Sequence, residues 1–569
     1  MFKICKEKYT KMSDQKVDNE LNLARDITTE QLEKTMDLKV GFDENERKWQ
    51  LIIRYEGSLA KVRQLSDFVV ELLGGYAIIT IREDLINVVS QLEEVIYIEK
   101  PKRLNFQIEN GIRISCINPV KRTPFNLSGE GVILGIADSG IDYTHEVFID
   151  ELGDTKILEL WDQTTDKIYT REDINNALKS AENQRLNIID SRDVSGHGTA
   201  VASIASSVAP KSDIIAVKLG NPVRDSFPRT SELMMGIDYL VRQAMYYGRP
   251  MAVNVSIGNN YGSHDGTSLL ATYIDTVADM GRLVFAVGTG NEGASATHTS
   301  GELVGDTAQT VEFSVGNYEQ SFNIQLWKAY VDTFGIAIKA PSGASSGVLS
   351  PTLGTSRYRL ENTDVFVYFG EPSPYSPYQE IYIEFIPVDN YISSGTWEIT
   401  LSPMRIVDGR YDMWLPAEST SSDTGFLTPT PETTLTVPST ASSVISVGAY
   451  NGYTDVFADF SGRGYTRVIG AVKPDIVAPG VNIVAASPNY SLKTNEYVEQ
   501  TGTSFATPFV TGSAALMMEW GIIRGNDPYL YGQKVKAYMI KGARQLPGFD
   551  VFPNPQMGYG ALCLRDSFG

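Results

Sequence analysis

The segment VILGIADSGID at residues 132–142 gives the clearest indication of the fold of this chain. Its apolar run ends abruptly on an aspartate, a serine and a glycine, which is the pattern of a buried strand that runs into a turn. Similar runs follow along the chain: IIAVKLG at 214–220, AVNVSIG at 252–258, RLVFAVGTG at 282–290 and VISVGAY at 444–450. Helical patterns lie between several of them. Buried strands that alternate with helices predict an α/β fold with a doubly wound parallel sheet.

Polar residues directly after these strands indicate where chemistry would take place. Asp138 ends the first strand, and Asn291 follows the strand at 282–290. Because open α/β sheets bind ligands at the carboxyl ends of their strands, we expect both residues at that edge. A lone aspartate or asparagine after a strand is more often a turn residue, so neither one assigns a reaction by itself.

The four histidines of the chain are His145, His197, His264 and His298. A histidine that serves as general base must be one of these. His197 lies in SGHGTAVASIAS at 195–206, where the glycines permit close backbone approach and the small residues predict a tightly packed helix. His197 is therefore the candidate base. For the other three we expect surface or rim positions.

A nucleophile is indicated by TGTSFATPFVTGSAALMMEW at 501–520, which contains Ser504. Small residues along this segment predict a buried helix with Ser504 near its N-terminus. The helix dipole would stabilise negative charge that develops on the serine oxygen. A serine at that position is also a common N-cap, so the segment alone leaves both interpretations open.

Five motifs together resemble the subtilisin family of serine peptidases. In chain order they are DSGID, GHGTAVAS, NVSIG, GTGNEG and GTSFATP. The order Asp, His, Ser is the one this family uses for its triad. The resemblance implies that Asp138 orients and stabilises the imidazolium, that His197 is general base and then acid, and that Ser504 is the nucleophile.

The same resemblance implies further roles around the triad. Asn291 would donate its side-chain amide to the oxyanion of the reaction intermediate. Ser256, Ile257 and Gly258, from NVSIG, would pair with the backbone of an extended substrate. The expected catalytic domain consists of residues 107–297 and 436–569.

Residues 46–106 predict a separate domain. WQLIIRY at 49–55, YAIITI at 76–81 and VIYIEK at 95–100 have strand patterns, and helical patterns lie between them. This order predicts a small ferredoxin-like α+β domain. It resembles the family's propeptide, an intramolecular chaperone, and implies self-cleavage between about Lys102 and Gln107. Residues 1–45 are polar, and we expect a loosely held arm.

Residues 298–435 have a different sequence pattern, in which many short segments of alternating apolar and polar residues are separated by Gly, Pro, Ser and Asn. They predict an inserted β jelly roll. We favour structural bracing over carbohydrate binding as its role. The architecture resembles the Csp-type germination proteases of clostridia, which implies a retained prodomain and a spore cortex-lytic zymogen as substrate.

The composition of the chain disfavours several classes of binding partner and cofactor. The formal net charge of -20, from 69 acidic and 49 basic residues, argues against nucleic acid or an anionic membrane surface. The three cysteines show no metal-ligand spacing and no disulfide framework, so we expect no disulfide, no metal and no cofactor. No apolar stretch has the length of a signal peptide or membrane span, which favours cytoplasmic synthesis with spore association, and we expect a monomer.

Two hypotheses for the function remain, and they belong to different classes of protein. The first is a serine endopeptidase that cuts its own prodomain and then other proteins. The alternative is a prodomain-locked scaffold or sensor that acts by binding through the jelly roll. The complete set of triad residues favours the enzyme.

Overall fold

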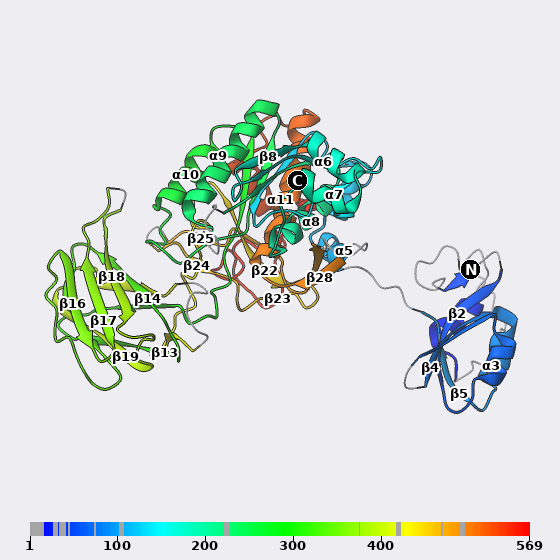
Figure 1. Cartoon of the computed structure of the whole chain (residues 1–569), viewed down its shortest axis with the longest axis horizontal. Coiled ribbons are helices and arrows are strands. Elements are labelled where there is room, and N and C mark those ends of the chain that lie inside the picture. Colours follow the sequence, from blue (N-terminus) through cyan, green and yellow to red (C-terminus); the bar gives the residue numbers. More distant parts are fainter. Residues whose placement is uncertain are drawn as a thin grey trace, which may run out of the picture. The chain divides into compact units, whose positions relative to one another are not determined.

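In the computed structural model the chain forms two compact units, residues 1–105 and 106–569 (Figure 1). The structure describes residues 16–26, 32, 41–43, 46–72, 75–101, 107–220, 228–374, 376–416, 423–467, 470–488 and 496–568. The predicted cleavage region therefore lies outside the described residues, except for Gln107 at its end. Within these ranges no helix is both long enough and apolar enough to cross a bilayer.

The first unit is an antiparallel sheet covered by short helices. Its central strand β2 pairs with β4 on one side and with β5 on the other, and β3 and β1 extend the sheet. Trp49, Leu51 and Ile53 alternate inward along β2 and are fully buried. The elements are α1 (Asn19–Asp26), β1 (Phe42–Asp43), β2 (Lys48–Tyr55), α3 (Ala60–Leu65), β3 (Phe68–Leu72), β4 (Tyr76–Arg82), α4 (Ile86–Ser90) and β5 (Val95–Glu99).

Part of the segment expected to be a loose arm belongs to this unit. Val17 forms a parallel bridge with Ile98, and Leu21 of α1 is fully buried in the core. The Asp18 carboxylate accepts a hydrogen bond from the Lys100 amide at 2.8 Å. Residues 16–26 therefore pack with the sheet. Their apolar side chains are too few to form a recognisable sequence pattern, but they are buried in its core.

The second unit contains the predicted parallel sheet. Its order is β23-β22-β11-β10-β6-β9-β7-β8, with β26 paired to β22, and only the edge strands β8 and β23 run antiparallel. Its strands are β6 (Ile133–Asp138), β7 (Ile157–Asp162), β8 (Lys167–Thr170), β9 (Asp213–Lys218), β10 (Met251–Val255), β11 (Leu283–Gly288), β22 (Ile445–Asn451), β23 (Val456–Phe457) and β26 (Ile476–Pro479).

Helices cover both faces of this sheet. The side of β6 that carries Leu134 and Ile136 packs with α8 (His197–Val208) and α11 (Thr503–Met518). The opposite side packs with α9 (Thr230–Tyr247) and α10 (Leu269–Ala278). Shorter elements complete the domain: α5 (Gln107–Ile114), α6 (Arg171–Lys179), α7 (Glu182–Ile188), β24 (Gly464–Tyr465), β25 (Val472–Lys473), β27 (Ile483–Ser487), β28 (Glu496–Gln500), α12 (Gln533–Lys541) and α13 (Leu564–Ser567).

The insert is formed by two antiparallel sheets that enclose their own core. One sheet has the order β12-β20-β14-β18-β17-β16 and the other β15-β19-β13-β21. Phe313, Phe385 and Trp397 pack together between them. The strands are β12 (His298–Glu302), β13 (Gln309–Val315), β14 (Phe322–Ala329), β15 (Thr333–Lys339), β16 (Gly354–Leu360), β17 (Thr363–Phe369), β18 (Tyr378–Pro387), β19 (Gly395–Arg405), β20 (Arg410–Trp414) and β21 (Gly425–Phe426). The predicted fold class is confirmed.

The expectation of no disulfide is wrong. Cys116 and Cys563 form a disulfide across a sequence separation of 447 residues. The Leu564 amide also donates to the Ser115 carbonyl oxygen at 2.9 Å, so the two segments lie side by side. Sequence spacing could not show this pairing, because tertiary folding alone brings the two ends of this unit together.

Candidate active site

Asp138 and His197 form a hydrogen-bonded pair at the carboxyl edge of the parallel sheet. Asp138 is the last residue of β6 and is 1% exposed, and His197 is the first residue of α8. The distance between His197 Nδ1 and Asp138 Oδ1 is 2.7 Å. A carboxylate at Nδ1 leaves Nε2 as the ring nitrogen that can take a proton from a nucleophile.

A second buried aspartate holds the two segments of this pair together. Asp193 Oδ1 accepts hydrogen bonds from the Ser139 hydroxyl at 2.8 Å and from the Gly196 amide at 2.9 Å. Its Oδ2 accepts from the amide and the hydroxyl of Thr199, at 2.8 and 2.7 Å. Asp193 therefore links the turn after Asp138 to the first turn of α8. Sequence analysis missed this residue, although it lies only four positions before His197.

Ser504 lies in the first turn of α11, where the helix dipole stabilises negative charge. Its hydroxyl donates to the Ser256 carbonyl oxygen at 3.0 Å, and the Ser256 hydroxyl donates back to the Ser504 carbonyl oxygen at 3.1 Å. The His197 ring packs beside Phe505, with ring centroids 5.4 Å apart. Catalytic hydrogen bonds are often formed only when substrate binds, and transfer to His197 requires the hydroxyl to turn from Ser256.

The Asn291 side chain is oriented by Thr503. Asn291 Oδ1 accepts hydrogen bonds from the Thr503 amide at 3.0 Å and from the Thr503 hydroxyl at 3.2 Å. With its oxygen held in this way, the Nδ2 group is the end that can donate to an oxyanion. Asn291 is exposed, as a residue that contacts substrate must be.

Residues 256–258 follow the end of β10 and are the segment predicted to pair with a substrate, so we call them the substrate strand. The residue after them, Asn259, forms an antiparallel bridge with Val437. A Cβ atom at Gly258 would lie 2.7 Å from Thr436 Oγ1, and one at Gly290 would lie 2.3 Å from Thr436 Cγ2. Thr436 thus packs between the substrate strand and the Asn291 turn, and no motif in the sequence pointed to it.

Two family models match the chain. Residues 129–366 and 424–560 match the subtilase family, and residues 15–102 match the Csp protease B prodomain. The chain belongs to the subtilase family of serine peptidases.

Known proteins similar to this subtilase agree with that assignment. The structure of the Clostridium perfringens CspB protease has 35% sequence identity and a TM-score of 0.76, over 81% of this chain and 96% of that chain. The serine protease AprX of Bacillus subtilis is 36% identical over 149 residues, which are 24% of this chain and 31% of AprX. The minor extracellular protease Vpr of Bacillus subtilis is 24% identical over 473 residues, which are 77% of this chain and 52% of Vpr. The subtilase thus spans about half or less of these two curated relatives.

The other three histidines are not at the surface, so that expectation is wrong. His145, His264 and His298 are all 1–2% exposed. His145 is buried beside β28, where its Nε2 lies 3.2 Å from the Glu496 carbonyl oxygen. His264 and His298 are buried where the insert meets the catalytic domain. Their polar sequence context could not reveal this burial.

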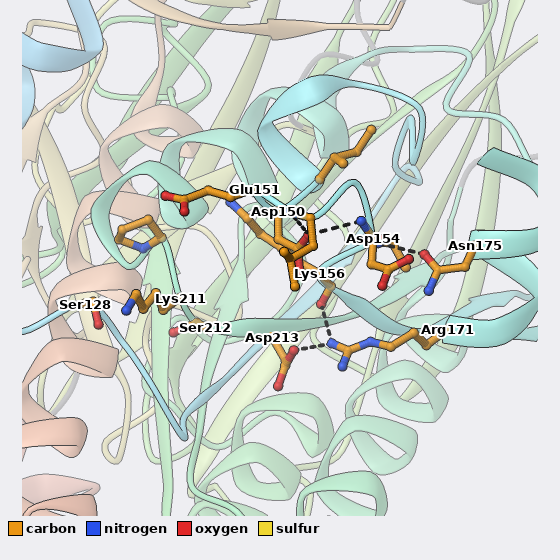
Figure 2. Close-up of a pocket in the computed structure, with 14 residues that line it drawn as sticks. Ser128, Asp150, Glu151, Asp154, Lys156, Arg171, Asn175, Lys211, Ser212 and Asp213 are labelled. Carbon is orange, nitrogen blue, oxygen red and sulfur yellow. Dashed lines mark hydrogen bonds and ion pairs between the residues drawn. The ribbon is translucent and has the colours of Figure 1, made fainter. Parts of the chain in front are cut away.

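A cavity of about 660 Å³ lies at the carboxyl end of α8, remote from the triad. Figure 2 shows Arg171 between the Asp213 carboxylate and the Lys156 carbonyl oxygen on its wall. Because α8 has 12 residues, its length separates this cavity from His197 by roughly 18 Å. None of the predicted site residues lines the cavity, so it is not part of the candidate active site.

The sequence showed no metal-ligand spacing. Among the described residues no group of three His, Cys, Asp or Glu side chains is arranged to hold a metal ion.

Proposed function

We propose that this subtilase is a serine endopeptidase in which Asp138, His197 and Ser504 form the catalytic triad. The observation that carries the proposal is the 2.7 Å contact between His197 Nδ1 and the buried Asp138 carboxylate, at the sheet edge where Ser504 also lies. Such a pair serves to orient an imidazole that accepts a proton.

In the proposed reaction, a peptide pairs with the substrate strand and presents one carbonyl carbon to Ser504 Oγ. His197 Nε2 takes the hydroxyl proton as the C–O bond forms, and Asn291 Nδ2 donates to the oxyanion. The tetrahedral intermediate collapses as the C–N bond breaks, and His197 gives its proton to the leaving amine. Water then releases the acyl group by the same steps, with His197 again as base and Asp138 stabilising the imidazolium.

We also propose that the enzyme cuts its own chain between about Lys102 and Gln107 and that the prodomain then stays bound to a monomeric enzyme. The match of residues 15–102 to the Csp protease B prodomain supports the first step. Activation of a spore cortex-lytic zymogen during germination is proposed from the Csp resemblance alone.

The test is the intact mass of the full chain and of its Ser504→Ala variant after expression. We expect the wild type to give two fragments, produced by a cut near residue 105, and the variant to give one uncut chain. Cutting that persists in the variant would exclude Ser504 as the nucleophile. Fragments that remain associated but hydrolyse no added peptide would support the prodomain-locked scaffold instead.

A further inference from the structure

The insert holds one loop of the catalytic domain, residues 259–267, which we call the junction loop. The Gly262 amide donates to Gln325 Oε1 on β14 at 2.8 Å. The hydroxyl of Ser376, also in the insert, donates to Asp265 Oδ2 at 3.2 Å. Because the junction loop directly follows the substrate strand, contacts with the insert act on the segment predicted to bind the peptide backbone.

Trp414 lies at the centre of this junction. It is the last residue of β20 and is 1% exposed. Its ring stacks on His264, with centroids 4.1 Å apart and planes at 6°, and on His298, with centroids 4.8 Å apart. Its Nε1–H donates to the Thr433 carbonyl oxygen at 3.2 Å. One side chain thus contacts both the junction loop and the segment at 431–437, which we call the return segment.

His264 connects the same two segments a second time. Its Nδ1 lies 2.8 Å from the Leu435 carbonyl oxygen and its Nε2 lies 3.1 Å from the Asn260 carbonyl oxygen. The imidazole therefore lies between the return segment and the junction loop and, when neutral, donates its one N–H to one of the two carbonyl oxygens. The flat face of Trp414 fixes the plane of the ring.

The return segment in turn reaches both sides of the candidate active site. Val437 and Asn259 exchange two backbone hydrogen bonds, of 2.8 and 3.1 Å, directly after the substrate strand. The Thr436 amide donates to the Thr289 carbonyl oxygen at 2.9 Å, two residues before Asn291. The return segment therefore sets the spacing between the substrate strand and the oxyanion donor.

We propose that Trp414 is a positioning residue, which acts through His264 and the return segment to set the spacing between the substrate strand and Asn291. The proposal rests on the proposed function. A peptide substrate must use both elements at once, because its backbone pairs with the strand while its reacting carbonyl reaches Asn291. A small ester without a peptide chain needs only the second element and is insensitive to the spacing.

The experiment compares Trp414→Leu with a matched control, Trp397→Leu. Trp397 is also a fully buried insert tryptophan, but it lies inside the sandwich core, where its ring contacts Phe313 and Phe385. Each full-length variant, together with the wild type, is assayed with a tetrapeptide anilide and with p-nitrophenyl acetate. Functional sites are counted with a fluorophosphonate, so that a smaller folded fraction does not alter the rates per site.

We expect Trp414→Leu to lower kcat/KM for the anilide by about tenfold while ester turnover changes by less than about twofold. Trp397→Leu should keep the wild-type ratio of the two rates. Trp414→Phe, which keeps an aromatic face, should recover most of the loss. His264→Gln serves as a second variant that should shift the ratio in the same direction, in case Trp414→Leu does not fold.

An unchanged ratio in both Trp414→Leu and His264→Gln would overturn the inference, and so would an equal shift in Trp397→Leu, which would indicate general bracing by the insert. A wild type that turns over neither substrate above the Ser504→Ala background would instead overturn the proposed function, and the inference with it.

Discussion

Replacing Asp193 with asparagine should loosen the join between the segments that carry Asp138 and His197. The carboxylate accepts five hydrogen bonds of 2.7–3.3 Å, from two amides and three hydroxyls. Asparagine keeps the size, but one of its two terminal atoms becomes a donor, so one buried amide N–H loses its acceptor. An unsatisfied buried group costs about 1–3 kcal/mol, and the lost charge adds to this cost. We expect local destabilisation of about 2–3 kcal/mol.

Hydrogen exchange of peptides that cover residues 193–199 measures this effect. A loss of 2–3 kcal/mol corresponds to exchange faster by about 30-fold to 150-fold in that segment. Asp190→Asn is the control, because the Asp190 carboxylate is 46% exposed and binds Lys167 at the surface, and an asparagine oxygen there can still accept from the Tyr169 hydroxyl. Peptide hydrolysis should fall only in Asp193→Asn. Exchange in Asp193→Asn within about twofold of the wild type would show that the Asp193 carboxylate does not hold these two segments together.

Three further changes test other parts of the structure. Asn291→Ala should lower kcat by about 10² to 10³ with little change in KM, as is typical for one oxyanion donor, and an unchanged kcat would remove Asn291 from the site. Burial lowers the pKa of His264 from 6.5 to about 4, so the unfolded chain binds a proton that the folded chain does not. The contribution of His264 to the free energy of unfolding should be fully present above about pH 6.5 and should fall by about 3 kcal/mol toward pH 4. The free energy of unfolding of His264→Gln should lack this loss. Alkylation in denaturant followed by peptide mapping should leave Cys116 and Cys563 unlabelled until a reductant is added, whereas labelling without reductant would contradict the disulfide.

The sequence sufficed for the parallel sheet because its strands are buried on both faces and therefore read as continuous apolar runs. It also indicated where polar residues gather, since the motif residues directly follow those strands. Asp138 and His197 meet as expected. The catalytic roles of Asp138, His197 and Ser504 stay predictions. So do the oxyanion role of Asn291 and the pairing role of the substrate strand.

What the sequence could not show depends on contacts between distant segments. The Cys116–Cys563 pair joins positions 447 residues apart, and no local pattern marks it. His264 and His298 lie in polar sequence, yet the docking of the insert buries them against Trp414. Thr436 is close to the site only because the return segment passes between the two elements that shape it.

The proposed function requires Ser504 to be a nucleophile that His197 activates. Its most direct test is to treat the wild type, Ser504→Ala and His197→Ala with a fluorophosphonate and to map the adduct by peptide mass. We expect one adduct per chain, on Ser504, which is absent from Ser504→Ala and forms far more slowly in His197→Ala. An adduct on another residue, or labelling of Ser504 at the same rate without His197, would contradict it.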